Sequence, residues 1–290
     1  MMTRLSYLFV KIFILLNIIV LAMFFVGWKQ ANKPPVNQKS LKILAIGNSF
    51  TNRAIDYLPQ LVNESGDSIV VACALIGSSS LETHWNNLQT NADAYYLRFV
   101  YEDTIVLYKN KSLTYCIEYL DWDYVILQQL STSSGIYNSY FPYITDLIDC
   151  IYDHASNKDV EIGFHQTWAY NQTSTREGFA NYDNDQLVMY DSIRYVSERI
   201  CQELNIKTFI PAGTAIQNAR ETLGDAFCYD GYHLNDLGRY VVACAWFETF
   251  FGKNCLNVKT VPTASVSDDT LYVLRSAVHN ACISPHSVTK

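Results

Sequence analysis

Short apolar runs and longer amphipathic stretches alternate along most of this 290-residue chain. Short runs that are apolar throughout are typical of strands buried on both faces of a sheet. Stretches with apolar residues three and four positions apart predict helices. The expected strands are residues 41–46, 69–74, 124–127, 160–164 and 207–210, and the expected helices are residues 54–62, 144–152, 186–203 and 236–251.

Strands that alternate with helices predict an α/β fold in which crossover connections make the strands parallel. We therefore expect a three-layer α/β/α sandwich with a mostly parallel, flavodoxin-like five-stranded sheet. Pro59 is expected to kink the first helix. The interval from about 86 to 120 is long for one crossover, and we interpret it as an insertion that contains a hairpin with its turn at residues 109–111.

The N-terminus has a different pattern, because Arg4 and Lys11 precede an apolar run at residues 12–28. Positive charge followed by an apolar run is typical of an export segment, and this run has about the minimum length that spans a bilayer. We interpret residues 1–28 as a signal peptide or an N-terminal membrane anchor, followed by a linker at 29–40. The positive-inside rule then predicts an extracytoplasmic location, either periplasmic, secreted or tethered to the membrane and facing outward.

Composition supports a folded chain and limits its partners. Hydrophobic residues make up 49% and charged residues 17%, which is typical of a chain with a core. The net charge of −7 and the lack of a basic cluster argue against nucleic acid as a partner. Eight cysteines contain no CxxC pair, so no metal is expected, and their spacing does not determine any disulfide pairing. No cofactor is expected either.

Small and polar residues follow the expected strands, and the carboxyl ends of parallel strands share one edge of a sheet. Ser49 comes directly after the first strand, in the sequence GNSF. It is either a helix-capping residue or a nucleophile exposed by a strand-to-helix turn. Asp230 stands three residues before His233, a spacing that lets a carboxylate reach the imidazole Nδ1 and leaves Nε2 free to face a serine. This pair favours the nucleophile.

These residues carry a family resemblance. The segments GNSF (47–50), GSSSLETHW (77–85), WDYVILQQLS (122–131) and HQTWAY (165–170), with the segment that begins at Asp230, occur in order. Together they resemble the SGNH (GDSL-like) hydrolase superfamily, and more closely an exported bacterial subgroup with GNSF in place of GDSL. The resemblance covers residues 41–252 as one hydrolase-like domain and leaves 253–290 as a C-terminal extension, with an apolar stretch that could pack back on the domain.

The resemblance implies roles for particular residues. Ser49 would be the nucleophile, His233 its base and Asp230 the residue that orients the base. The backbone N–H groups of Ser49 and Gly77 would bind the oxyanion. A third donor, Gln128 or Gln129, would replace the asparagine that this superfamily usually presents, and we favour Gln128.

The remaining candidates are aromatic or imidazole residues near strand ends, which either line the substrate site or only pack. They are His84, Trp85, His165, Trp168 and Tyr170. With export and the superfamily analogy, they predict a serine esterase that removes a small acyl group, foremost O-acetyl, from a carbohydrate. A lipase, thioesterase or acyltransferase using the same residues is the first alternative. A catalytically silent glycan-binding module is the second.

Overall fold

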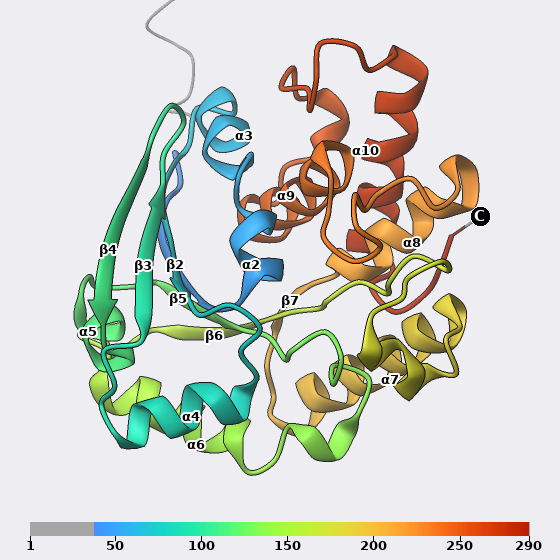
Figure 1. The fold of residues 1–290 in the computed structure, drawn as a ribbon. Coiled ribbons are helices and arrows are strands. Elements are labelled where there is room, and N and C mark those ends of the chain that lie inside the picture. The colour runs from blue at the N-terminus through green and yellow to red at the C-terminus, as the bar shows by residue number, and fades with distance from the viewer. Residues whose placement is uncertain (1–37, 290) are drawn as a thin grey trace, which may run out of the picture. The chain divides into compact units, whose positions relative to one another are not determined.

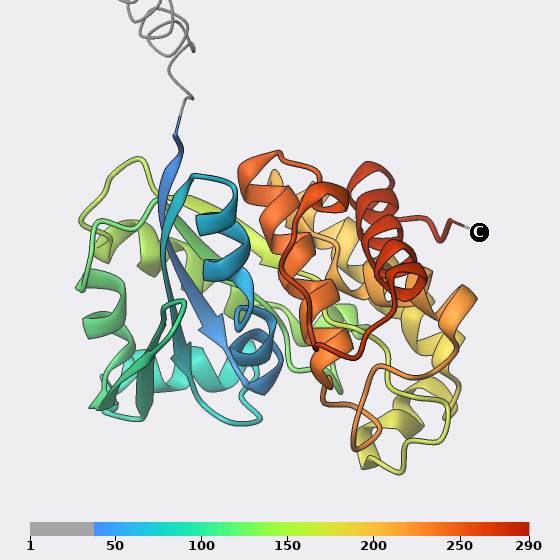
Figure 2. The ribbon, with the colours of Figure 1, turned by 90° about the horizontal axis from the view of Figure 1, so that it is seen from above.

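The computed structural model describes residues 38–289, which form a seven-stranded sheet covered by helices on both faces (Figures 1 and 2). The strand order is β4-β3-β2-β1-β5-β6-β7. Neighbouring strands from β2 to β7 pair in parallel, which confirms the expected three-layer sandwich and its parallel core. The five predicted strands are β1 (Ser40–Gly47), β2 (Ser68–Leu75), β5 (Tyr124–Leu127), β6 (Glu161–His165) and β7 (Thr208–Ile210).

Two further strands make the sheet larger than the predicted five. β3 (Tyr95–Val100) and β4 (Ile105–Lys111) form an antiparallel hairpin that extends the sheet beyond β2. The hairpin was predicted, but the position of its turn was wrong, because the chain reverses at residues 101–104. The polar residues 109–111 belong instead to β4, whose position at the edge of the sheet leaves almost all of its side chains exposed.

The first predicted helix is two helices, α2 (Ser49–Ala54) and α3 (Leu58–Glu64). Pro59 lies in the first turn of α3, where its missing N–H costs nothing, so it starts a helix instead of kinking one. The helices α6 (Tyr143–His154), α7 (Gln186–Glu203) and α9 (Asp236–Phe251) lie where they were expected. Sequence patterns did not predict α4 (Leu81–Gln89), α5 (Leu113–Glu118), α8 (Ala212–Leu223) and α10 (Asp268–Ile283).

Successive side chains of β1 point into two different cores, one on each face of the sheet. Ile43 and Ala45 face the core formed with α2, α3, α8, α9 and α10, whereas Leu44 and Ile46 face the core formed with α4, α5 and α6. Both sets are fully buried, which explains why the strand is apolar throughout.

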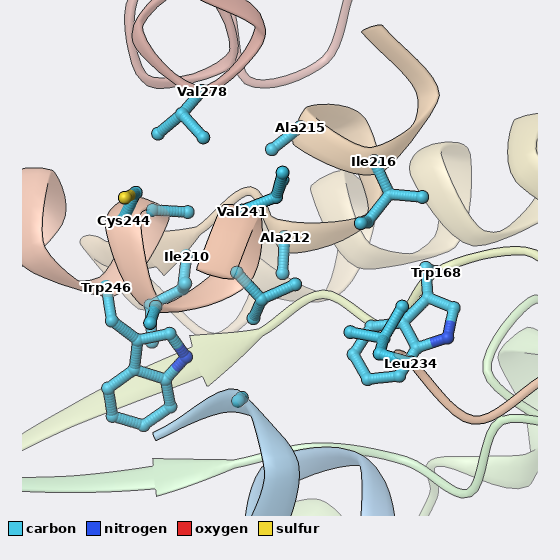
Figure 3. Close-up of a cluster of buried hydrophobic side chains, with 14 of the residues drawn as sticks. Trp168, Ile210, Ala212, Ala215, Ile216, Leu234, Val241, Cys244, Trp246 and Val278 are labelled. Carbon is cyan, nitrogen blue, oxygen red and sulfur yellow. The ribbon is translucent and has the colours of Figure 1, made fainter. Parts of the chain in front are cut away.

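The C-terminal region completes the first of these cores. Helix α10 lies against α8 and α9 (Figures 1 and 2), and Val278 points from it toward the side chains of those helices (Figure 3). Below them, Trp246 of α9 lies beside Ile210 at the end of β7 (Figure 3). The extension after residue 252 therefore packs back on the domain.

The predicted export segment and all but the end of its linker lie outside the described residues. Among residues 38–289, no helix is long and apolar enough to cross a membrane. All eight cysteines lie in the described part of the chain and are free thiols there.

Candidate active site

Ser49 is the first residue of α2, and only the cap residue Asn48 separates it from the last residue of β1, Gly47. The cap of this helix is Asn48, whose side-chain oxygen accepts the Phe50 N–H at 3.0 Å. Asn48 also donates to the Ser79 carbonyl oxygen at 2.9 Å, which fixes the turn to the loop after β2. Because Asn48 takes the capping role, the partly exposed Ser49 hydroxyl is free for another contact.

That contact is with His233, which is 184 positions away in the sequence. The Ser49 Oγ lies 2.9 Å from the His233 Nε2, and the His233 Nδ1 lies 2.7 Å from an oxygen of Asp230. The second Asp230 oxygen accepts the backbone N–H groups of His233 at 2.7 Å and Tyr232 at 3.2 Å. Ser49, His233 and Asp230 therefore form one continuous hydrogen-bonded chain.

The carboxylate of Asp230 is stabilised in its charged form. Partial burial by itself would raise the pKa of Asp230, but hydrogen bonds from the backbone and ring of His233 and from the backbone of Tyr232 outweigh it and lower the pKa. An ionised Asp230 fixes the His233 ring with Nε2 directed at the serine.

Two backbone N–H groups beside Ser49 have no acceptor among residues 38–289. One belongs to Ser49 itself and the other to Gly77, two residues after the end of β2. The loop that holds Gly77 is joined to the serine turn, since the Ile76 N–H donates to the Gly47 carbonyl oxygen at 3.2 Å. Gly77 is exposed, with open space where a Cβ would stand. Both predicted backbone donors are therefore free to bind an oxyanion.

Gln128 and Gln129 differ in how many hydrogen-bonding groups of their side-chain amides remain free. The Gln129 amide oxygen accepts from the N–H groups of Leu81 and Leu130, and its nitrogen donates to the carbonyl and hydroxyl oxygens of Ser139. All of its hydrogen-bonding groups are used, so the suggestion that Gln129 is an oxyanion donor is wrong for this conformation.

Gln128 forms hydrogen bonds to residues on both sides of Ser49. Its amide nitrogen donates to the Asn48 side-chain oxygen at 2.8 Å, and its oxygen accepts from the Thr51 hydroxyl. One N–H of this amide has no acceptor within the described part of the chain, so its role as third donor stays a prediction.

The expectation that His84 lines the substrate site is wrong. Its ring is buried between the Ser79 hydroxyl, 3.0 Å from Nε2, and the Tyr95 hydroxyl, 2.9 Å from Nδ1. Burial lowers the pKa of His84 to about 3, so it is a neutral residue that ties α4 to β3. Trp85 is partly buried and packs on the core that α4 covers, and its role in lining the substrate site stays a prediction.

His165, the last residue of β6, and the residues that follow it also pack inside the protein. His165 accepts the Trp246 indole N–H at 3.1 Å, and burial lowers its pKa to about 3. Trp168 and Tyr170 are both 0% exposed, so the expectation that they line the substrate site is wrong. Figure 3 shows Trp168 packed beside Leu234, inside the core that α9 covers. Aromatic residues near a strand end do not reveal which side of the loop they occupy.

A cleft of about 660 Å³ adjoins the Asp230 side of the triad, and sequence analysis did not find it. Most of its walls come from the loops after β5 and β6 and from the short 3-10 helix Glu177–Tyr182, which are too short to show a periodic pattern. Asp230 and Tyr232 belong both to this cleft and to the loop that carries His233. Within the described residues, no group of three His, Cys, Asp or Glu side chains could hold a metal ion. The lining consists of Thr132, Thr175, Arg176, Glu177, Gly178, Asn181, Asp230 and Tyr232.

The fold is that of the SGNH (GDSL-like) hydrolases. A proposed SGNH hydrolase from Slackia heliotrinireducens superposes with a TM-score of 0.50 at 17% identity, over 73% of this chain and 99% of the other. A proposed GDSL-like lipase from Parabacteroides merdae gives a TM-score of 0.51 at 12% identity, over 76% and 100% of the two chains. At these identities the likeness concerns the fold alone.

The chain belongs to the DUF4886 family, described as a domain of unknown function, whose model matches residues 42–281. A DUF4886 family protein from Bacteroides uniformis is 36% identical and has a TM-score of 0.83. The match covers 87% of this chain and 98% of that protein. No functionally curated protein matches the chain.

Proposed function

We propose that this protein is an exported serine esterase that hydrolyses a small acyl ester, foremost an O-acetyl group, on a carbohydrate. The observation that carries the proposal is the hydrogen-bonded chain from Ser49 through His233 to Asp230. It stands at the carboxyl edge of a parallel sheet, where α/β folds bind ligands.

The geometry supports a two-step acyl transfer. The Ser49 Oγ attacks the ester carbonyl while His233 Nε2 accepts its proton, and Asp230 stabilises the resulting imidazolium. The N–H groups of Ser49 and Gly77 bind the oxyanion of the tetrahedral intermediate, after which His233 returns the proton to the departing alcohol. Water then attacks the acyl-serine by the same route, releases the acid and restores the Ser49 hydroxyl.

The adjoining cleft favours a carbohydrate over a long acyl chain. Its volume of about 660 Å³ lies within the usual range for small-ligand sites. Hydroxyl, amide and charged side chains line it, and these groups bind sugar hydroxyls better than an alkyl chain. The basic and then apolar pattern of residues 1–28 supports export or a membrane tether.

Two assays on the purified chain test the proposal. We expect hydrolysis of p-nitrophenyl acetate, with rates that fall as the acyl group is lengthened, and covalent labelling of Ser49 by a fluorophosphonate. Ser49→Ala should abolish labelling and lower kcat by about 10³-fold or more. Undiminished hydrolysis by Ser49→Ala would exclude this mechanism, and a preference for long acyl chains would favour a lipase or thioesterase.

The same labelling reaction separates an enzyme from a catalytically silent glycan-binding module. A folded protein that binds glycans but reacts with no fluorophosphonate would be the binding module. A serine hydrogen-bonded to an oriented imidazole predicts reaction instead.

A further inference from the structure

Arg176 is an unpaired cation in the cleft beside the triad. No carboxylate of residues 38–289 lies within 4.0 Å of its guanidinium, and its Nε is buried without a hydrogen-bond partner. The other arginines of the described chain all make an ion pair or a side-chain hydrogen bond. Arginine has five donors and keeps its charge. The Tyr170 hydroxyl takes one hydrogen bond from Arg176, and the remaining donors of the half-buried side chain are available to a ligand.

The guanidinium is held near the reacting groups. It lies over the Tyr232 ring, 4.2 Å from the ring centroid, and the Tyr232 ring centroid is 4.2 Å from that of His233. Stacking on an aromatic face leaves the in-plane N–H groups of arginine free to bind a planar anion. Arg176 therefore faces the cleft with only the Tyr232 ring between it and His233.

The segment that carries Arg176 is fixed to the loop of the triad. The Asn171 N–H donates to the Gly231 carbonyl oxygen at 2.8 Å. Gly231 has a φ of +89°, and a Cβ there would lie 3.2 Å from Ser174, so glycine allows the two loops to meet. This contact sets the position of Arg176 relative to Asp230 and His233.

No nearby carboxylate of residues 38–289 makes a direct ion pair with Arg176. Both oxygens of Asp230 are occupied by His233 and Tyr232. Glu177 lines the cleft but makes no ion pair with the neighbouring arginine. Glu177, Asn181, Thr132 and Thr175 instead offer donors and acceptors for hydroxyl groups around the cation.

We infer that the alcohol part of the ester, which departs through this cleft, is an acidic sugar whose carboxylate binds Arg176. This inference rests on the proposed function and specifies its substrate class as acylated uronic-acid-type glycosides. The carboxylate accepts two parallel N–H bonds from the guanidinium, which is the strongest geometry for this pair. The sugar hydroxyls bind the surrounding polar side chains.

Three matched substrates test the inference. They are the mono-O-acetylated methyl glycosides of glucuronic acid, of its methyl ester and of glucose, which differ only at the carboxyl position. We expect kcat/KM for the acid to exceed that for the methyl ester by about 10–100-fold, as for a charge-assisted hydrogen-bonded pair. Arg176→Gln should bring this ratio close to one, and Arg176→Lys should retain part of it.

Arg199→Gln is the matched control. Arg199 is also stacked on a tyrosine ring, 3.8 Å from the centroid of Tyr137, but it pairs with Glu203 on the exposed face of α7, outside the lining of the cleft. The control should keep the full preference for the acid. Equal kcat/KM for the acid and its methyl ester in the wild-type protein, or an unchanged ratio in Arg176→Gln, would overturn the inference.

A binding measurement separates this inference from the proposed function. Calorimetric titration of Ser49→Ala with the deacetylated acidic and neutral glycosides needs no turnover. We expect tighter binding of the acid, and loss of that difference in the double variant with Arg176→Gln. Absence of esterase activity with this binding intact would refute the proposed function alone, whereas esterase activity with no preference for the acid would refute the acidic-sugar inference alone.

Discussion

The indole ring of Trp168 stacks on the ring of Phe50, with 4.1 Å between centroids and 12° between planes. Its N–H donates to the Tyr232 carbonyl oxygen at 2.8 Å. One fully buried side chain therefore touches the residue after Ser49 and holds the residue before His233. Although Trp168 does not line the substrate site, it positions the two halves of the triad relative to each other.

Replacing Trp168 should separate positioning from stability. Trp168→Phe keeps an aromatic stack but loses the N–H that holds Tyr232, so we expect kcat for p-nitrophenyl acetate to fall about 10-fold, with a smaller change in KM. Trp168→Ala leaves a large cavity and should cost about 3–5 kcal/mol of unfolding free energy in urea. Wild-type kcat in a stably folded Trp168→Phe would contradict the positioning role.

Asp230→Asn tests the orientation of the catalytic base. The amide keeps the shape of the side chain but can direct an N–H at the imidazole, which favours the wrong tautomer, so kcat should fall about 10⁴-fold. Asp236→Asn is a suitable control, because Asp236 is an exposed carboxylate three residues beyond His233 that pairs with Arg239. Similar losses in both variants would show that general electrostatics, and not the bond to His233, matters.

Gly77 offers a test of the backbone oxyanion donor. Gly77→Ala adds a methyl group into open space and keeps the N–H, so activity should stay within about 2-fold of wild type. Gly77→Pro removes the N–H and should lower kcat about 10²–10³-fold, the cost of losing one oxyanion donor. Circular dichroism and urea unfolding of both variants show whether the fold is retained. Equal activity of the two folded variants would exclude the Gly77 N–H from the mechanism.

Stability should decrease in acid because of two buried histidines. Burial lowers the pKa of His84 and His165 from 6.5 to about 3, so the unfolded chain binds more protons than the folded protein between these values. The unfolding free energy then falls as pH drops from about 6.5 toward 3, by about 1.4 kcal/mol per pH unit for each histidine, and these groups contribute no such dependence above that window.

Urea unfolding between pH 4 and 7 measures this slope. His84→Gln should reduce it by one histidine's share, because glutamine does not titrate. His165→Gln should remove the other histidine's share, because burial lowers the pKa of His165 in the same way. An unchanged slope in His84→Gln would show that this histidine is not protonated on unfolding.

The sequence determined the sheet core and indicated the Asp230–His233 pair, because both depend on local patterns. A strand buried on both faces must be apolar throughout, so β1, β2, β5, β6 and β7 were recognisable. The bounds of α7 and α9 follow from periodicity. Asp230 and His233 can interact within one short loop, so their three-residue spacing indicated the pairing that the structure contains.

Only the tertiary structure decided what depends on contacts between distant segments. The Ser49–His233 distance and the saturated bonds of Gln129 arise where separate loops meet at one edge of the sheet. Burial of Trp168 and the lack of an ion-pair partner for Arg176 among residues 38–289 depend on which side of a loop faces solvent. Sequence periodicity reports the face of a helix or strand, but irregular segments have no period. The residues that line the cleft could therefore be identified only from the tertiary structure.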